Sequence, residues 1–316
     1  DDTLALCKRS DAVLFGAIGD PKYDNNPEAT VRPEQGLLRL RKELELFSNI
    51  RPVQVFPTLI KNSPLRKEII SGTDFVILRE LTGGIYFGEK NRSEDGKTAS
   101  DLCIYSEEEI SRIAHLAFKA AKSRRNKLTL VDKANVLESS RLWRSVVTKI
   151  SKSYPEVTLN YLFVDNAAMQ LILNPSQFDV ILTENMFGDI LSDEGSVIGG
   201  SIGLLPSASV GEKYAMFEPI HGSFPEGAGK NIANPIAAIL SVAMLLDHFG
   251  LKEETNAVIK AVNRSLKDGI VTPDLKAKST YGTDDVGHFI ASQITDAEDY
   301  RGLNKENIGL GKSTII

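Results

Sequence analysis

The sequence predicts an α/β protein with a largely parallel sheet, and two observations lead to this prediction. Short runs of β-branched and aromatic residues alternate along the chain with longer amphipathic stretches, as in repeated β–α–β units. The chain has 316 residues, 42% of them hydrophobic, so it can bury a large core and is long enough for two domains. We therefore expect two α/β domains.

Five short runs are expected to form strands and three longer ones to form helices. The strands cover residues 12–15, 75–78, 129–131, 158–164 and 180–183, and the helices cover 3–10, 106–122 and 235–249. Helix 106–122 is the clearest, because Ser106 and Glu109 form a capping box ahead of an apolar stripe made by Ile110, Ile113, Ala114, Ala117, Phe118 and Ala121. Helix 235–249 is apolar on almost every side, so it should be buried in a core or a subunit interface. Two Gly- and Pro-rich stretches, 201–209 and 218–229, are expected to be loops that bring backbone close to a ligand.

The composition narrows the class of protein. A net charge of −5 argues against nucleic-acid binding, and the one strongly basic cluster, 119–127, falls where helix 106–122 ends and complements its dipole. Cys7 and Cys103 are too few and too far apart for a metal knuckle or a disulfide framework, which fits a reducing compartment. No apolar stretch is long enough to cross a bilayer. We expect a cytoplasmic protein with no nucleic-acid or membrane partner.

The most informative stretch is residues 185–195 (NMFGDILSDEG), which places two carboxylates four residues apart. If Asp189 opens a helix, Asp189 and Asp193 lie on one face of it, and oxygen ligands of this kind suit Mg²⁺ or Mn²⁺. Spacing alone is more typical of a solvated helix face or of a cap near the helix dipole. The preceding run 178–183 (FDVILT) predicts a buried strand, which puts both carboxylates at a strand's carboxyl end and favours a metal site.

Other candidate residues also lie near the ends of predicted elements. Arg41, Arg51 and Arg79 could converge on one cleft and bind a dicarboxylate, although each alone is more typical of a surface or ion-pair arginine. Lys133 follows strand 129–131 and could act as a base or be an ordinary exposed lysine. Asp165 ends another strand and is a candidate third carboxylate for the metal.

Tyrosine, histidine and glycine motifs leave further alternatives open. Tyr86 follows the glycine pair of TGGIYFGE and could donate a proton or simply pack. His221 lies in the second Gly-rich stretch, where its ring could stack on a base or accept from a ligand, whereas the other histidines fit structural roles. Residues 227–231 (GAGKN) lack the first glycine and the Ser or Thr of a P-loop, which leaves a phosphoryl-transfer enzyme little support. A G-x-G-x-x-G fingerprint is also missing, which disfavours a common Rossmann dehydrogenase.

Taken in order, these motifs resemble the isocitrate/isopropylmalate dehydrogenase family of β-hydroxyacid oxidative decarboxylases over nearly the whole chain. The motifs are GLLRLRKELELFSNIRP, RELTGGIYFGE, VDKANVLE, NMFGDILSDEGSVIGGSIGLLPSAS, EPIHGS and NIANPIAAILS. The resemblance implies a two-domain fold with largely parallel sheets that binds NAD without the Rossmann fingerprint. Residues 1–46 and 200–316 would form a discontinuous NAD-binding domain, and residues 47–199 a domain for metal ligands and dimerisation. The family's first strand and helix are absent before Asp1, so the natural chain is expected to be longer.

The resemblance also implies the roles of individual residues. Arg41, Arg51, Arg79, Asn135 and Asp165 would bind the substrate, and Tyr86 and Lys133 would be the acid–base pair. The metal, Mg²⁺ or Mn²⁺, would be held by Asp165, Asp189 and Asp193. The active site would be shared within a homodimer, with Lys133 and Asp165 contributed by the neighbouring subunit.

Substrate and cofactor choice depend on a few positions. The apolar pair Leu37 and Leu38 favours an isopropyl group, and hence NAD-dependent conversion of (2R,3S)-3-isopropylmalate to 4-methyl-2-oxopentanoate and CO₂ in leucine biosynthesis. D-malate, tartrate and isocitrate remain alternative substrates. A non-catalytic regulatory subunit is a further alternative, although it would be expected to lose the catalytic residues. The cofactor would lie against Glu34, His221, Gly222, Ser223, Glu226 and Asn234, where the carboxylate of Glu226 would repel the 2′-phosphate of NADP.

Overall fold

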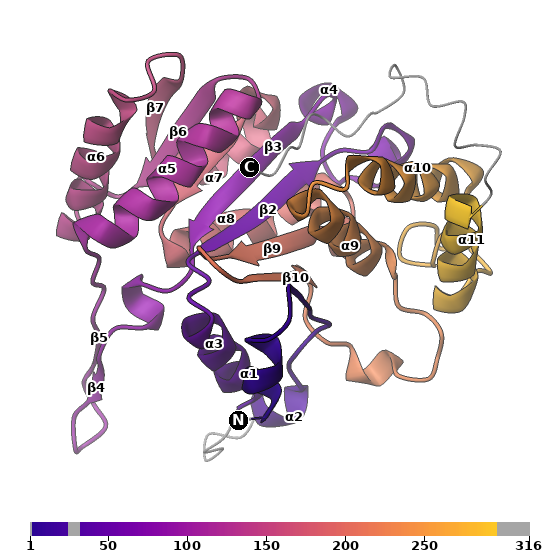
Figure 1. Ribbon diagram of the computed structural model, residues 1–316, viewed down its shortest axis with the longest axis horizontal. Coiled ribbons are helices and arrows are strands. Elements are labelled where there is room, and N and C mark those ends of the chain that lie inside the picture. Colours follow the sequence, from indigo (N-terminus) through magenta and orange to yellow (C-terminus); the bar gives the residue numbers. More distant parts are fainter. Residues whose placement is uncertain (1, 25–31, 296–316) are drawn as a thin grey trace.

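A mixed sheet of eight strands forms the centre of the computed structural model, which describes residues 2–24 and 32–295 (Figure 1). From one edge to the other the strands are β1 (Val13–Leu14), β10 (Ala215–Pro219), β9 (Pro206–Val210), β2 (Ser48–Gln54), β3 (Asp74–Glu80), β8 (Val180–Thr183), β6 (Lys127–Asp132) and β7 (Thr158–Phe163). Strands β3, β8, β6 and β7 are parallel to one another, and β1 is parallel to β10. Strands β10, β9, β2 and β3 pair in antiparallel fashion. The predicted α/β class is confirmed, and the parallel part of the sheet contains four of the five predicted strands, those at 75–78, 129–131, 158–164 and 180–183.

Helices cover both faces of the parallel part of the sheet. Helices α5 (Glu107–Ser123) and α6 (Glu138–Ser151) pack on one face, and α7 (Val164–Leu173) and α8 (Asn185–Ile198) on the other. Each pair of helices forms a hydrophobic core with its face of the sheet, and strand β3 contributes side chains to both cores because side chains alternate along a strand. Val76 and Leu78 lie in the core under α5 and α6, and Phe75 and Ile77 lie in the core under α7 and α8. The same alternation directs Arg79, two residues after Ile77, toward α8.

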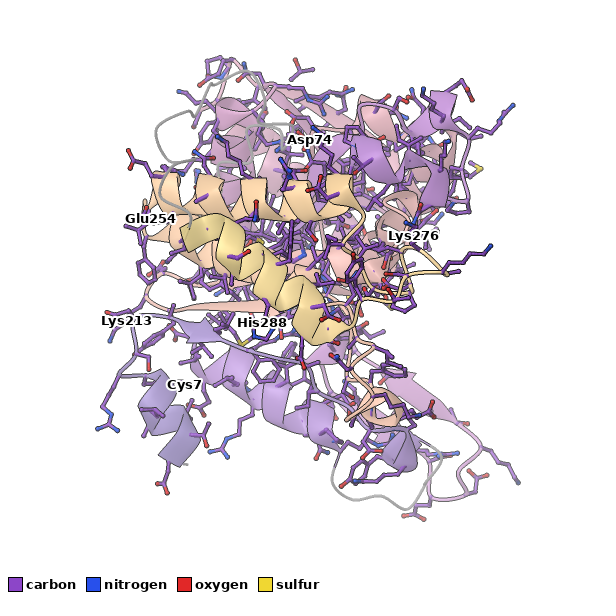
Figure 2. All side chains as sticks on the ribbon, turned by 90° about the vertical axis from the view of Figure 1, so that its right-hand side faces the viewer. Cys7, Asp74, Lys213, Glu254, Lys276 and His288 are labelled. Atoms are coloured by element: carbon purple, nitrogen blue, oxygen red, sulfur yellow. The ribbon has the colours of Figure 1, made fainter. Side chains whose placement is uncertain are left out.

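The remaining elements surround the antiparallel part. Helices α9 (Ile236–His248), α10 (Lys252–Asp268) and α11 (Thr283–Thr295) share a third core, and Figure 2 views the molecule from their side, with His288 labelled on α11. Helices α1 (Asp2–Cys7) and α3 (Pro33–Glu43) lie at the bottom of Figure 1. The hairpin of β4 (Lys90–Arg92) and β5 (Ala99–Asp101) projects from the body at the lower left. The short helices are α2 (Pro21–Asp24), α4 (Lys67–Ile70), and the 3₁₀ turns η1 (Pro57–Asn62), η2 (Gly84–Tyr86), η3 (Pro175–Gln177), η4 (Ile202–Leu204) and η5 (Pro225–Gly227).

The helix predictions are confirmed with small shifts of their ends. Ser106 accepts a hydrogen bond from the Glu109 N–H at 3.2 Å, and the Glu109 carboxylate accepts from the Ser106 N–H at 2.7 Å, which is the predicted capping box of α5. All residues of the predicted apolar stripe of α5 are buried. Helix α9 is largely buried, and α1 is shorter than predicted.

Three predictions, of two loops and of one helix start, were wrong in part. Residues 201–209 are not all loop, because 206–209 belong to the buried strand β9, which pairs with β10 on one side and β2 on the other. Pro206 is the first residue of this strand, a position that tolerates proline. Glu218 and Pro219 likewise end β10 instead of starting a loop. Helix α8 begins at Asn185, not at Asp189, because the Glu184 side chain caps it by accepting the Phe187 N–H at 2.8 Å.

Two further predictions concern the basic cluster 119–127 and the two cysteines. In the basic cluster, Arg124 forms ion pairs with Asp74 and Asp179 just past the end of α5. Its charge therefore balances two aspartates in addition to complementing the helix dipole. Cys7 and Cys103 are both free thiols.

Within residues 2–24 and 32–295, no helix has the length and apolar character needed to cross a membrane. The sheet runs without a break from residues of the first predicted domain into those of the second, and the domain boundaries stay a prediction.

Candidate active site

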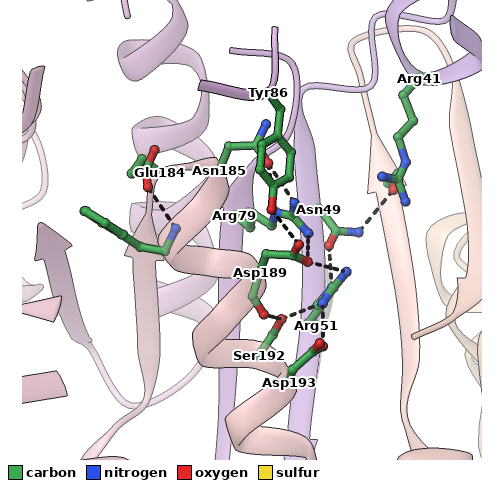
Figure 3. A network of polar contacts seen from close by, with 12 residues as sticks. Arg41, Asn49, Arg51, Arg79, Tyr86, Glu184, Asn185, Asp189, Ser192 and Asp193 are labelled. Atoms are coloured by element: carbon green, nitrogen blue, oxygen red, sulfur yellow. Dashed lines mark hydrogen bonds and ion pairs between the residues drawn. The ribbon is translucent and has the colours of Figure 1, made fainter. Parts of the chain in front are cut away.

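Two arginines and two aspartates meet where α8 crosses β2 and β3 (Figure 3). Arg51 lies on the face of β2 that also carries Val53, and Arg79 on the face of β3 that carries Ile77, so both guanidiniums point toward α8. Asp189 and Asp193 lie one turn apart on α8. Helix α8 can approach this closely because residue 188 is glycine: a Cβ there would lie 2.6 Å from the Cγ of Arg79.

The guanidinium of Arg79 is held on two sides. Its Nε and Nη2 donate to the Asn185 Oδ1 at 3.0 and 2.7 Å, and its Nη1 donates to the Asp189 Oδ1. The guanidinium of Arg51 donates to Asn49 at 2.7 Å and to the hydroxyl of Ser192 at 2.5 Å. It also lies 3.6 Å from Asp189 and 3.5 Å from Asp193. These polar contacts thus fix the orientation of both guanidiniums.

Tyr86 closes one side of this cluster. It ends the turn η2, its hydroxyl donates to the Asp189 Oδ2 at 2.9 Å, and the Arg79 guanidinium lies 5.5 Å from the centre of its ring. Partial burial and the adjacent Asp189 carboxylate raise the pKa of Tyr86 to about 12. The hydroxyl therefore keeps its proton at neutral pH, as a proton donor must.

The electrostatics of the cluster are balanced. Burial, together with neighbouring Arg79, lowers the pKa of Arg51 to about 10, so Arg51 is still charged at neutral pH. Burial would raise the pKa of Asp189, but the charges of Arg79 and Arg51 outweigh it and the pKa is lowered. At Asp193 burial prevails and the pKa is raised, although this side chain remains 64% exposed. Two positive and two negative groups leave no excess charge, so a cation and an anion could enter together.

Arg41 lies beside this cluster but does not bind its aspartates. It projects from the last turn of α3 and pairs with Glu218 of β10 at 2.7 Å. Its charge still contributes to lowering the pKa of Arg51, Arg79 and Asp189. The three predicted arginines therefore gather in one region, with Arg51 and Arg79 in direct contact with the aspartates and Arg41 in a separate ion pair.

Lys133 and Asp165 form a pair of their own. Lys133 follows β6 and its Nζ lies 2.9 Å from Asp165, in the first turn of α7. This hydrogen bond is the main reason that the pKa of Asp165 is lowered. Asn135, two residues after Lys133, is exposed. In the described part of the chain no three His, Cys, Asp or Glu side chains gather as a metal site, so this single chain does not bring Asp165 to Asp189 and Asp193.

The predicted cofactor residues fall into two groups. Around Gly19, the Ser223 hydroxyl donates to the Gly19 carbonyl, and the Glu34 Oε1 lies 3.4 Å from where a Gly19 Cβ would be. His221 and Gly222 belong to the same loop, and Glu226 is exposed in η5 just beyond it. Asn234 is apart from these contacts and donates to Asp274 at 3.0 Å. Leu37 packs against the core of Leu44, Leu46, Leu81 and Met216, and Leu38 is half-buried.

Several polar residues of the site were not singled out from the sequence. They are Asn49, Asn185, Ser192 and Glu218. Asn49 could have been found, because it lies two residues before Arg51 and so shares its strand face. Asn185 lies two residues after the strand predicted for 178–183, at the carboxyl end where open α/β sheets bind ligands. Nothing local marks Ser192 or Glu218.

Comparisons with known proteins agree with this architecture. A family model described as isocitrate/isopropylmalate dehydrogenase matches residues 1–290. The chain is 56% identical over 299 residues to a 3-isopropylmalate dehydrogenase of Bacteroides fragilis, covering 94% of this chain and 84% of that protein. It is 55% identical to the 3-isopropylmalate dehydrogenase of Wolinella succinogenes, covering 92% and 82%. The crystal structure of isocitrate dehydrogenase from Methylococcus capsulatus superposes with a TM-score of 0.83 at 33% identity, covering 93% of this chain and 84% of that one.

These matches place the molecule among the α/β dehydrogenases. The chain belongs to the isocitrate/isopropylmalate dehydrogenase family.

Proposed function

We propose that this dehydrogenase converts (2R,3S)-3-isopropylmalate to 4-methyl-2-oxopentanoate and CO₂ with NAD⁺ as oxidant, a reaction of leucine biosynthesis. The observation that carries the proposal is the convergence of Arg51 and Arg79 beside Asp189, Asp193 and Tyr86. The names of relatives such as those from Bacteroides fragilis and Wolinella succinogenes support this substrate over isocitrate.

Buried guanidiniums suit a substrate with two carboxylates. Arg51 and Arg79 are 7% and 2% exposed, and a guanidinium binds a carboxylate with two parallel hydrogen bonds. Binding a dianion here without compensation would leave the site negatively charged. A divalent cation at Asp189 and Asp193 would restore the balance, so substrate and metal are expected to bind together.

The donor set of α8 fits Mg²⁺ or Mn²⁺. Asp189 and Asp193 offer carboxylate oxygens one turn apart, and the exposure of Asp193 leaves it accessible to an incoming ion. Asp165 of a neighbouring subunit would complete the protein ligands. When bound, the metal supplies Lewis-acid polarisation of the substrate oxygen. For NAD, Glu34 and Ser223 offer hydrogen-bonding groups beside Gly19, and Glu226 offers an exposed carboxylate in η5 just beyond the loop 221–223. When bound, the nicotinamide supplies the hydride acceptor.

The chain's own residues supply binding and proton transfer. Arg41, Arg51 and Arg79, with Asn135, orient the malate carboxylates. The amine of Lys133, from the neighbouring subunit, accepts the proton of the substrate hydroxyl. Tyr86 holds a proton at its Oη and donates it to the substrate carbon from which CO₂ leaves.

A homodimer is part of the proposal. Helices α7 and α8 pack side by side and expose large apolar side chains, namely Met169, Ile172, Leu173, Ile190 and Val197. Apolar side chains in such number on adjacent helices are typical of a subunit interface. The same two helices carry Asp165 and Asp189, so a second copy bound here would bring its own Asp165 near this region.

A spectrophotometric assay tests the substrate and the cofactor. Purified protein with Mg²⁺ is given 3-isopropylmalate, D-malate, tartrate or isocitrate, each with NAD⁺ or NADP⁺, and formation of the reduced nucleotide is followed. We expect the highest kcat/KM with 3-isopropylmalate and NAD⁺. The substitution Leu38→Ser should lower kcat/KM for 3-isopropylmalate about tenfold, because the fit of an isopropyl group contributes about 1 to 3 kcal/mol. The kcat/KM for D-malate, which has no such group, should be nearly unchanged.

Other results of these assays would favour one of the alternative functions. A preference for isocitrate, D-malate or tartrate would overturn the proposed substrate and keep the family's chemistry. Full activity of Asp193→Ala would contradict the metal site. Inactivity of the purified protein with every substrate would favour a regulatory subunit.

A further inference from the structure

Asn185 connects three elements of the site. It is fully buried as the first residue of α8, and its Oδ1 accepts from both the Nε and the Nη2 of Arg79 on β3, at 3.0 and 2.7 Å. Its Nδ2 donates at 3.0 Å to the carbonyl of Gly83, three residues before Tyr86. One amide therefore contacts the arginine, the turn that carries the tyrosine, and the start of the helix that carries the aspartates (Figure 3).

The backbone of Asn185 is itself held by a buried polar pair. Its N–H donates to the Tyr105 hydroxyl at 3.0 Å, and that hydroxyl donates to the Glu184 carboxylate at 3.1 Å. The Tyr105 ring also packs directly against the glycine pair that precedes Tyr86: a Cβ at Gly84 would lie 2.2 Å from the Tyr105 Oη. The amide of Asn185 thus has little freedom to turn away from Arg79 or Gly83.

The chemistry of an amide at this place is specific. Asn185 occupies the Nε–Nη2 edge of the guanidinium without neutralising it, which leaves the Nη1 side and the positive charge directed toward Asp189 and the space beside it. A carboxylate at residue 185 would form a bidentate ion pair with Arg79 and compete with an anionic substrate. It would also face the Gly83 carbonyl with no proton to donate.

We propose that Asn185 is a positioning residue that orients Arg79 for the substrate carboxylate and, through Gly83, places the Tyr86 hydroxyl. The proposal rests on the proposed function, in which Arg79 binds a carboxylate of a 3-substituted malate. Asn185 does not touch the substrate and acts only through these two side chains.

A double-mutant cycle between Asn185 and Arg79 tests this proposal on the full-length protein with Mg²⁺ and NAD⁺. Asn185→Ala should raise the KM for 3-isopropylmalate about tenfold and also lower kcat, because misplacing a binding group weakens both binding and the reacting geometry. Asn185→Asp, which keeps the shape, should raise KM at least as much. The Asn185→Ala/Arg79→Lys double variant should be little worse than Arg79→Lys alone, since residues that act as a unit are not additive.

A matched control separates positioning from stability. Ser265 is fully buried in α10, on another side of the molecule, and donates to the Ile270 carbonyl, so Ser265→Ala also deletes a buried hydrogen bond. It should lower the thermal midpoint like Asn185→Ala but leave KM unchanged. If Asn185→Ala does not fold, the cycle is run with Asn185→Ser, which also removes the amide and adds no charge beside Arg79.

The results distinguish the positioning role of Asn185 from the proposed function on which it rests. Additive effects of Asn185 and Arg79 on kcat/KM, or an unchanged KM in both Asn185 variants, would overturn the positioning role while leaving the proposed function intact. An unchanged KM in Arg79→Lys would instead overturn the assignment of Arg79 to the substrate.

Discussion

At the scale of single residues, the site depends on polar side chains that a central sheet would ordinarily exclude. Asn49 and Arg51 are buried in β2, where unpaired polar groups would be costly. The cost is offset because each finds a partner: Asn49 donates to Ser209 at 3.1 Å and accepts from Arg51 at 2.7 Å. The sequence indicated Arg51, Arg79, Asp189 and Tyr86 through residue type and position, but not the uncharged partners that orient them.

Gly188 gives a prediction at this scale. Gly188→Ala would gain up to about 1 kcal/mol of helix propensity. The new Cβ would however lie 2.6 and 2.7 Å from the Cγ and Cβ of Arg79. These two atoms are the first of the Arg79 side chain, so they cannot move away without a shift of the Arg79 backbone. We expect the clash to prevail, with a net loss of about 1 to 3 kcal/mol and a higher KM for the substrate.

Urea unfolding and steady-state kinetics measure both effects. The control is Gly287→Ala, another glycine inside a helix, where a Cβ meets nothing within 4 Å. It should stabilise the protein by about 0.5 to 1 kcal/mol without changing KM. Equal behaviour of the two variants would show that close approach of α8 to Arg79 is not required.

At the scale of elements, local signals predicted the helices better than the antiparallel strands. The capping box and apolar stripe of α5 are written in consecutive residues, so they could be read without knowledge of the fold. Strands β2, β9 and β10 carry proline, serine or asparagine and are buried by neighbours far away in the sequence. Their burial, not their propensity, makes them strands.

The cap of α5 gives a prediction at this scale. Ser106→Ala removes the acceptor for the Glu109 N–H and should cost about 1 kcal/mol of unfolding free energy. Chemical denaturation measures this loss, and activity should not change. Ser111→Ala in the same helix is the control, since its hydroxyl donates only to the Glu107 carbonyl of the preceding turn and its loss should cost little. If Ser111→Ala lowered the unfolding free energy as much as Ser106→Ala, the loss would come from removing any serine hydroxyl of this helix and not from removing its cap.

At the scale of the whole molecule, one chain supplies only part of the proposed machinery in one place. Arg51, Arg79, Tyr86, Asp189 and Asp193 are together, whereas Lys133 and Asp165 bind each other. A shared site in a dimer would unite the two sets. The exposed apolar side chains of α7 and α8 are the surface through which we expect that dimer to form.

Mixed dimers test this arrangement. Tyr86→Phe and Lys133→Ala should each lower kcat by about 10² or more. Mixed after joint unfolding and refolding, they should recover roughly a quarter of the original activity, because a heterodimer has one intact site and one doubly altered site. Mixing Tyr86→Phe with Arg79→Lys, whose residues belong to one set, should recover nothing. No recovery in the first mixture would mean that Tyr86 and Lys133 act within one chain.

The sequence by itself determined the α/β class, the position of helices α5 and α9 with the cap of α5, and the family, because periodicity, capping residues and motifs are properties of neighbouring residues. Only the tertiary structure decided which polar groups meet. The register of β2 and β3 places Asn49 opposite Arg79, and the packing of α8 over these strands joins Arg79 to Asn185, more than a hundred positions further along the chain. Such contacts depend on how elements pair and pack, which no local pattern specifies.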